Sequence, residues 1–173
     1  MRMLLLCAAP GLQFRIRVRQ EPMFAESTTL YAEDEPGNTL GRAKVEVTGI
    51  QGGKRSGHPD AVQRPLLTGM FVDPEHRRRG VAGRLLREAE EQVAAWGFDE
   101  LLLHVQQSNS AAASLYASAG YEPDEPGTAV LVDGTWVESR GGSWWERWWR
   151  GQSYVMLRKP LPSDSESSAE AET

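Results

Sequence analysis

The sequence predicts a single α/β domain with a mixed central sheet, and three observations support that prediction. The chain has 173 residues, which is enough for one domain with a sizeable core and short for two. Apolar residues alternate with polar ones in short segments and recur every three or four residues in a longer one. A strand, a helix and a strand also follow one another within about 40 residues, as in a βαβ unit with parallel strands. We expect helices on both faces of this sheet.

The first predicted strand lies near the N-terminus. Residues 12–19 alternate apolar and polar side chains at every step, which is typical of a half-buried strand. The first 20 residues contain four arginines and no acidic residue, so residues 1–11 are alternatively a targeting remnant or a disordered end. Residues 20–28 leave room only for a turn or a very short helix.

Two more strands and a long loop precede the βαβ unit. Residues 29–32 and 43–47 predict strands, because apolar and β-branched side chains dominate both, and turn-forming residues at 34–38 separate them. Residues 49–64 contain several glycines and few apolar side chains, which is typical of a polar loop.

The βαβ unit itself has the clearest pattern in the chain. Residues 65–72 are mostly apolar and end at Asp73-Pro74, which predicts a buried strand. Residues 80–97 predict an amphipathic helix, and residues 101–105 predict the second buried strand. A shorter helix follows over about residues 110–118. The apolar positions of the longer helix are Val81, Leu85, Ala89, Val93 and Trp96.

The last third of the chain has a different composition. Residues 129–137 predict a hairpin around an Asp-Gly turn, and residues 154–157 predict a closing strand. Five of the six tryptophans lie within residues 136–149, where they could cover the edge of the sheet, form a lid over substrate or contact a partner or membrane. Residues 162–173 lack large apolar side chains and are expected to be a disordered acidic tail.

Charge and composition exclude several classes of protein. The net charge is −5, and four acidic residues lie in the tail, so the remaining chain carries −1 and lacks the basic excess of a nucleic-acid-binding domain. No apolar stretch is long enough to cross a bilayer. The single cysteine, Cys7, excludes an internal disulfide and indicates a reducing compartment. The three histidines lack metal-ligand spacing, so we expect no metal.

The segment HRRRGVAG, residues 76–83, is the first candidate site. It joins the predicted buried strand to the start of the long helix. Free backbone N–H groups and the helix dipole make such a helix start a ready site for an anion, and the two glycines allow a ligand to approach the backbone. The same pattern also fits a plain solvated helix start or a basic patch.

Two motifs in this region resemble those of the GNAT acetyltransferase superfamily. Residues 77–82, RRRGVA, fit its acyl-CoA motif Arg/Gln-x-x-Gly-x-Gly/Ala. Residues 109–116, NSAAASLY, followed by Gly120-Tyr121, resemble its second signature. The resemblance covers residues 66–121 most strongly and is greatest to the plastid and cyanobacterial protein N-acetyltransferases. It implies a GNAT-type domain over residues 1–161, with acetyl-CoA as co-substrate and no metal.

The resemblance also implies roles for individual residues. Tyr116 would protonate the departing thiolate of CoA, and Asn109 would contact the cofactor from the start of the second helix. The GNAT pattern further places one or two helices between the first two strands, and residues 20–28 are too short to form both. The residues implied along the pantetheine arm are Met70, Phe71 and Val72, and those implied around the pyrophosphate are Arg77, Arg78, Arg79, Gly80, Val81, Ala82 and Gly83.

His104 is the candidate general base. It lies five residues before Asn109, where some members of the superfamily place a carboxylate. An amine must be neutral to attack a thioester, and an imidazole accepts a proton near neutral pH directly or through water. The alternative is that His104 only packs against the sheet, as Tyr116 could only fill core space.

These features predict an enzyme that transfers an acetyl group from acetyl-CoA to a primary amine of a protein. The acceptor would be a lysine side chain or an N-terminal α-amine, attacking directly in a ternary complex. A small-molecule amine such as a polyamine is the alternative acceptor, and a non-catalytic acyl-CoA-binding module is the alternative function. We expect no nucleic-acid partner and no transmembrane segment. The resemblance suggests a chloroplast location, and otherwise the cytoplasm.

Overall fold

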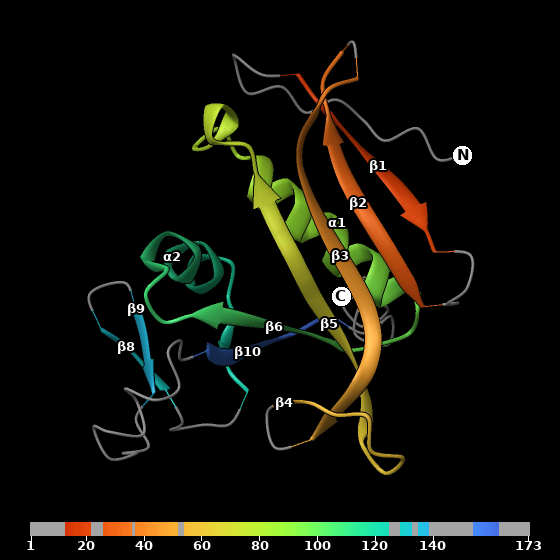
Figure 1. The fold of residues 1–173 in the computed structure, drawn as a ribbon, viewed down its shortest axis with the longest axis vertical. Coiled ribbons are helices and arrows are strands. Elements are labelled where there is room, and N and C mark those ends of the chain that lie inside the picture. The colour runs from red at the N-terminus through yellow and green to blue at the C-terminus, as the bar shows by residue number, and fades with distance from the viewer. Residues whose placement is uncertain are drawn as a thin grey trace, which may run out of the picture.

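A mixed β-sheet connects most of the described chain (Figure 1). The computed structural model describes residues 13–21, 26–35, 37–51, 54–124, 129–132, 135–138 and 154–162. Their elements, in chain order, are β1 (Arg15–Gln20), β2 (Ser27–Glu33), β3 (Thr39–Gln51), β4 (Lys54–Arg55), β5 (Val62–Val72), the 3-10 turn η1 (Pro74–His76), α1 (Val81–Ala95), β6 (Glu100–Gln106), α2 (Ser110–Ser118), β7 (Glu122–Pro123), β8 (Ala129–Val132), β9 (Thr135–Glu138) and β10 (Tyr154–Pro160).

The strand order confirms the predicted fold class. The sheet runs β1-β2-β3-β5-β6-β10-β7, with β4 paired to β3 and with β8 and β9 forming a separate hairpin. Every neighbouring pair in the sheet is antiparallel except β5 and β6, which are parallel and joined by α1. This is the predicted βαβ unit, and it lies at the middle of the sheet.

The two parallel strands stay together over a short distance only. Their register pairs Leu66 with Leu102 and Leu67 with Leu103, and no later residues of β5 and β6 pair. Beyond this point Gly69 has a φ of 60°, and the pairing of β3 with β5 shifts register. A left-handed residue and a register shift are signs of a β-bulge, which bends a strand. β5 and β6 therefore diverge toward their carboxyl ends (Figure 1).

Both described helices pack on the same face of the sheet, and within the described residues no helix covers the second face. Leu85 of α1 and Tyr116 of α2 belong to one buried cluster together with Leu103 of β6. The crossovers β5-α1-β6 and β6-α2-β7 both join parallel strands and both move the same way across the sheet. Right-handed crossovers in one direction leave their helices on one face. The smaller buried cluster on the second face contains Ile50, Leu66, Leu102 and Met156.

Most of the predicted elements are confirmed, and one predicted loop was wrong. Within residues 49–64, β3 continues to Gln51 and β5 already begins at Val62. Gly49 lies inside β3 and not in a loop. A Cβ on it would lie 2.5 Å from the carbonyl oxygen of Ser56 and 2.9 Å from the Cβ of Ala61. Glycine is required there because two backbones approach closely inside a strand.

Both predicted helices and the predicted hairpin are present, and the closing strand extends to Pro160. The predictions for residues 1–11, for residues 139–149 of the tryptophan-rich segment and for the acidic tail beyond Pro162 lie outside the described residues. Among the described helices, none is long and apolar enough to cross a membrane.

Candidate active site

A groove opens where β5 and β6 diverge. Its volume is about 840 Å³, within the range of small-molecule sites. Its wall comes from the end of β5, from the loop and first turn of α1, from the end of β6 with α2, and from Tyr154 of β10. The structure brings twelve of the predicted site residues to its wall: Met70, Phe71, Val72, Arg77, Arg78, Gly80, Val81, Ala82, Gly83, His104, Asn109 and Tyr116. Arg79 is exposed and does not line it.

The loop between β5 and α1 has a fixed backbone shape. The Asp73 carboxylate accepts a hydrogen bond from the Glu75 N–H at 2.9 Å and caps η1. Arg77 Nε donates to the Val72 carbonyl at 3.1 Å, which ties the loop to the strand end. Arg78 and Gly80 then adopt positive φ values of 61° and 81°. These contacts present the start of α1 to the groove.

The start of α1 has the properties of an anion site. Gly80 is its N-cap and makes no side-chain capping bond, so no side chain occupies the first N–H groups of the helix. A Cβ built on Gly80 or on Gly83 would meet open space, which leaves room for a ligand against the backbone. His76 Nδ1 is buried beside this loop without a hydrogen-bond partner among the described residues. These features fit the diphosphate of an acyl-CoA.

The wall contributed by β5 is mainly backbone. Met70 and Val72 are half-buried and pack against the main core, whereas Phe71 is 49% exposed. Because residues 68–72 do not pair with β6, the edge of β5 that faces β6 has backbone groups available to an extended ligand. This arrangement suits the amide-rich pantetheine arm that the sequence motif implied.

The opposite wall carries the polar candidates. His104 is half-buried on β6, where it pairs in register with Met156 of β10. The side-chain oxygen of Asn109 accepts a hydrogen bond from the Ala112 N–H at 3.1 Å and so caps α2. This capping explains by itself why an asparagine suits position 109, and it leaves the amide N–H groups for a ligand.

Tyr116 lies at the inner end of the groove. It is 5% exposed, and this burial raises the pKa of its phenol to about 12. Its ring lies 5.9 Å from that of Tyr121, whose hydroxyl donates to Glu90 of α1 at 3.1 Å. Lys159 contacts the same carboxylate at 2.7 Å. With its pKa raised in this way, the Tyr116 phenol stays protonated at neutral pH, as a proton donor must.

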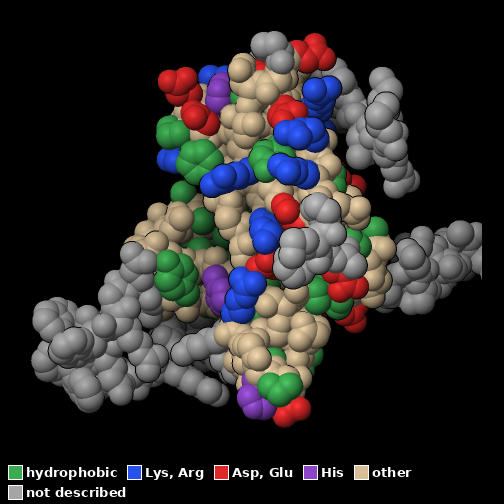
Figure 2. Space-filling model, turned by 45° about the vertical axis from the view of Figure 1, so that its right-hand side comes forward, with side chains coloured by type: hydrophobic (Ala, Val, Ile, Leu, Met, Phe, Trp, Pro, Cys, Tyr) green, Lys and Arg blue, Asp and Glu red, His purple; other side chains and the backbone are tan. Residues whose placement is uncertain are grey.

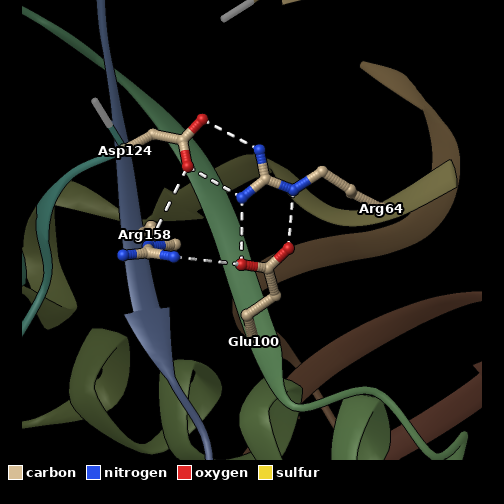
Figure 3. A network of polar contacts seen from close by, with 4 residues as sticks. All are labelled: Arg64, Glu100, Asp124 and Arg158. Carbon is tan, nitrogen blue, oxygen red and sulfur yellow. Dashed lines mark hydrogen bonds and ion pairs between the residues drawn. The ribbon is translucent and has the colours of Figure 1, made fainter. Parts of the chain in front are cut away.

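An ion-pair network closes the narrow end of the parallel strands on the second face (Figure 3). Arg64 of β5 donates to both oxygens of Glu100 of β6 at 2.6 and 2.9 Å. It also donates to both oxygens of Asp124, after β7, at 2.9 and 2.7 Å. These hydrogen bonds raise the pKa of Arg64 above its usual value. The network joins β5 to β6 two residues before the first paired leucines, at the end opposite to the one where the strands diverge.

Sequence reasoning missed five polar or aromatic residues of the groove. They are Thr68, Gln106, Ser114, Ser118 and Tyr154, and Tyr154 is 55% exposed. Tyr154 reaches the groove because β10 pairs with β6, which places it opposite Gln106. No local pattern carries that information. The Thr68 position could have been suspected, because it lies two residues before the segment predicted along the pantetheine arm.

A group of three potential metal ligands lies at the start of the loop. The ligand atoms of Asp73, Glu75 and His76 are all within 4.8 Å of one another. Two of its three members are carboxylates, so the spacing of histidine and cysteine, on which the prediction of no metal rests, does not reveal it. One oxygen of Asp73 already caps η1, as described above.

Comparison with known sequences gives one family. A sequence model described as the acetyltransferase (GNAT) family matches residues 8–121. The acetyl transferase GW6a of Oryza sativa subsp. japonica is 32% identical over 109 residues, covering 62% of this chain and 26% of the relative. A chloroplastic GCN5-related N-acetyltransferase 10 of Arabidopsis thaliana is 34% identical over 79 residues, covering 46% of this chain and 30% of the relative. The chain thus spans less than a third of the length of these curated relatives.

Solved structures share the fold. A nourseothricin acetyltransferase has a TM-score of 0.54 and 26% identity, covering 80% of this chain and 67% of that one. The Naa20 protein of Chaetomium thermophilum, in complex with a bisubstrate analogue, has a TM-score of 0.53 and 22% identity, covering 80% and 68%.

Proposed function

The chain belongs to the acetyltransferase (GNAT) family, and from that premise we propose that it transfers an acetyl group from acetyl-CoA to a primary amine of a protein. The acceptor would be a lysine side chain or an N-terminal α-amine. One observation carries the proposal: a single groove connects the anion-binding start of α1 to His104 and Tyr116. Phosphate recognition and a pair of proton-transfer groups are the two parts that direct acetyl transfer needs.

The residues of the groove supply the proton transfers of such a reaction. Acetyl-CoA would supply the thioester carbonyl that the amine attacks. A neutral amine forms the new C–N bond while the C–S bond breaks, so the amine loses one proton and the thiolate gains one. His104 accepts the first proton, directly or through water, and Tyr116 donates the second. The raised pKa of Tyr116 keeps that donor protonated.

A small-molecule amine is the second candidate acceptor. The observation in its favour is the 26% identity to a nourseothricin acetyltransferase, a protein named for a small molecule. The plastid is the proposed location, supported by the names of two chloroplastic Arabidopsis relatives. A fluorescent fusion of the chain, imaged with a plastid marker, tests the location independently of the acceptor.

Mass spectrometry of a peptide library incubated with the full chain and acetyl-CoA tests the acceptor class. Acetylated lysines or N-termini support the proposal, and acetylation of a panel of small amines alone overturns it. Tyr116→Phe is expected to lower kcat by about 100-fold, the lower range of general acid catalysis. Tyr121→Phe is the matched control, because Tyr121 is a buried tyrosine that does not line the groove. Equal kcat values for the two variants would contradict the role of Tyr116.

A further inference from the structure

Two rows of side chains cross the second face of the sheet and end at the groove. In antiparallel pairs, directly opposite residues point to the same face. The helix-facing positions alternate with them and include Leu30, Ala43 and Val45. The first row is Arg17 (β1), Tyr31 (β2), Arg42 (β3) and Phe71 (β5), and the second is Arg19, Thr29, Lys44 and Thr68 on the same strands. Phe71 and Thr68 both line the groove.

This face is basic, and its cations lie outermost. Its β1–β4 portion carries six basic residues: Arg15, Arg17, Arg19, Arg42, Lys44 and Arg55. Three carboxylates lie among them: that of Glu21 accepts a hydrogen bond from Thr29 at 3.2 Å, and those of Glu33 and Glu46, which form the ion pairs, are only 8% and 13% exposed. Their partners are much more exposed, with 51% for Arg17 and 57% for Arg55. Figure 2 shows blue side chains gathered on this side of the molecule.

Arg19 and Arg42 are the cations best placed to bind another molecule. Both are exposed, and within the described part of the chain no carboxylate lies at ion-pair distance from either. Arg17, in contrast, is held between Glu33 at 2.6 Å and the ring of Tyr31 at 4.9 Å. The basic face therefore presents unsatisfied positive charge next to the groove, although the whole chain has a net charge of −5.

We infer that this basic face docks the acceptor and selects protein segments with acidic side chains near the acetylated amine. The inference rests on the proposed function, because it takes the groove as the place where the amine reacts. Neighbouring strands are about 4.8 Å apart and an extended peptide advances about 3.3 Å per residue. Arg42 lies one strand beyond β5. Counted from His104 on β6, the strand with Arg42 is the second and the strand with Arg19 is the fourth, which are about 10 Å and 19 Å away. Acidic residues about three and about six positions from the amine would therefore meet Arg42 and Arg19.

A peptide fits this surface better than a nucleic acid does. The two rows end at Phe71 and Thr68. An acceptor peptide bound along them therefore continues into the groove that also contains His104 and Tyr116. Phe71 is 49% exposed and gives an apolar contact to a side chain next to the amine. The chain without its acidic tail is close to neutral, whereas binding to phosphate backbones usually needs a basic excess over the domain.

The test uses two peptides that each contain one lysine. One has glutamates at about three and about six residues from the lysine, and the other has glutamines there. Kinetics of the full chain should give a KM about tenfold lower for the glutamate peptide, with the same kcat, and the difference should vanish at about 0.5 M salt. Arg19→Gln with Arg42→Gln should abolish the difference, and Arg19→Lys with Arg42→Lys should retain most of it. Arg87→Gln, an exposed charge on α1, should retain it fully.

Binding of the same peptides with their lysine already acetylated separates this inference from the proposed function. Fluorescence anisotropy should show tighter binding of the glutamate peptide, dependent on Arg19 and Arg42. If the peptides bind in this way but are not acetylated, the docking proposal is supported and the acetyltransferase proposal is refuted. Turnover with equal KM values for the two peptides would overturn the docking surface alone.

Two further outcomes would also overturn it. One is binding that appears only after residues 163–173 are deleted, since the acidic tail of the chain would then be the occupant. The other is displacement of the glutamate peptide by a tenfold lower concentration of oligothymidylate, which would indicate a nucleic-acid surface.

Discussion

Arg64→Met should destabilise the protein by disconnecting β5 from β6 at the base of the groove. Methionine keeps most of the apolar stem of arginine but none of its charge. The Arg64 side chain is 18% exposed. It forms ion pairs with Glu100, whose side chain is 19% exposed, and with Asp124, whose side chain is 10% exposed. The substitution removes four hydrogen bonds and leaves those two carboxylates close together.

The expected loss is about 2–3 kcal/mol in the free energy of unfolding. Breaking a fully buried ion pair costs about 3–5 kcal/mol. The partial exposure of this network reduces that cost, and so does Arg158, which remains 3.8 Å from Glu100 and 3.9 Å from Asp124. For a domain of this size, such a loss lowers Tm by about 5–10 °C. Urea denaturation followed by circular dichroism measures the free energy, and calorimetry measures Tm.

A triple variant without the two carboxylates tests whether their uncompensated charge causes the loss of stability. Adding Glu100→Gln and Asp124→Asn to Arg64→Met removes the unpaired carboxylates and should recover more than half of the lost stability. Equal instability of the single and triple variants would show that lost packing, and not uncompensated charge, causes the effect. If the free energy of unfolding of the Arg64→Met protein differs from that of the original by less than about 0.5 kcal/mol, the network does not stabilise the fold as stated.

Three other predictions concern the groove and the basic face. Because burial raises the pKa of Tyr116 to about 12, kcat should not fall with a midpoint near pH 10, where an ordinary tyrosine ionises, and a pH profile of kcat checks this. Gly80→Ala should cost about 1 kcal/mol, because φ is 81° there, and should raise the KM for acetyl-CoA about tenfold. Gly97→Ala, at a φ of 85° outside the groove, should cost similar stability and leave that KM unchanged. Glu33→Gln should strengthen binding of the glutamate peptide, measured by anisotropy, since it removes the ion pair that now occupies Arg17.

The βαβ unit could be predicted because its signals are local. The apolar period of α1 and the position of Gly80 at the helix start are both legible within about 20 residues. Most residues predicted for the candidate site lie in these local segments, and the fold brings all but Arg79 to one groove.

The features that were missed depend on contacts between distant residues. Arg64 lies 36 positions from Glu100 and 60 from Asp124, so no sequence window contains the network. Tyr154 reaches the groove only because β10 pairs with β6. The position of β10 also explains why both described helices lie on one face. β10 lies between β6 and β7 and is antiparallel to each, so β6 and β7 are parallel and are joined by a crossover through α2. Gly49 was misread because a glycine at a close backbone approach looks, in sequence, like a glycine in a loop.

The position of β10 also affects how the chain can fold during its synthesis. β6 has one edge on β5 and the other on β10, which leaves the ribosome more than 45 residues later than β6 does. Until then, one edge of the buried strand β6 has no partner in the sheet, and the groove lacks Tyr154. An exposed apolar strand edge invites pairing with other chains. Nascent or truncated chains that end before residue 154 should therefore aggregate, so a reporter fused for expression is better placed after the C-terminus than inserted between α2 and β10.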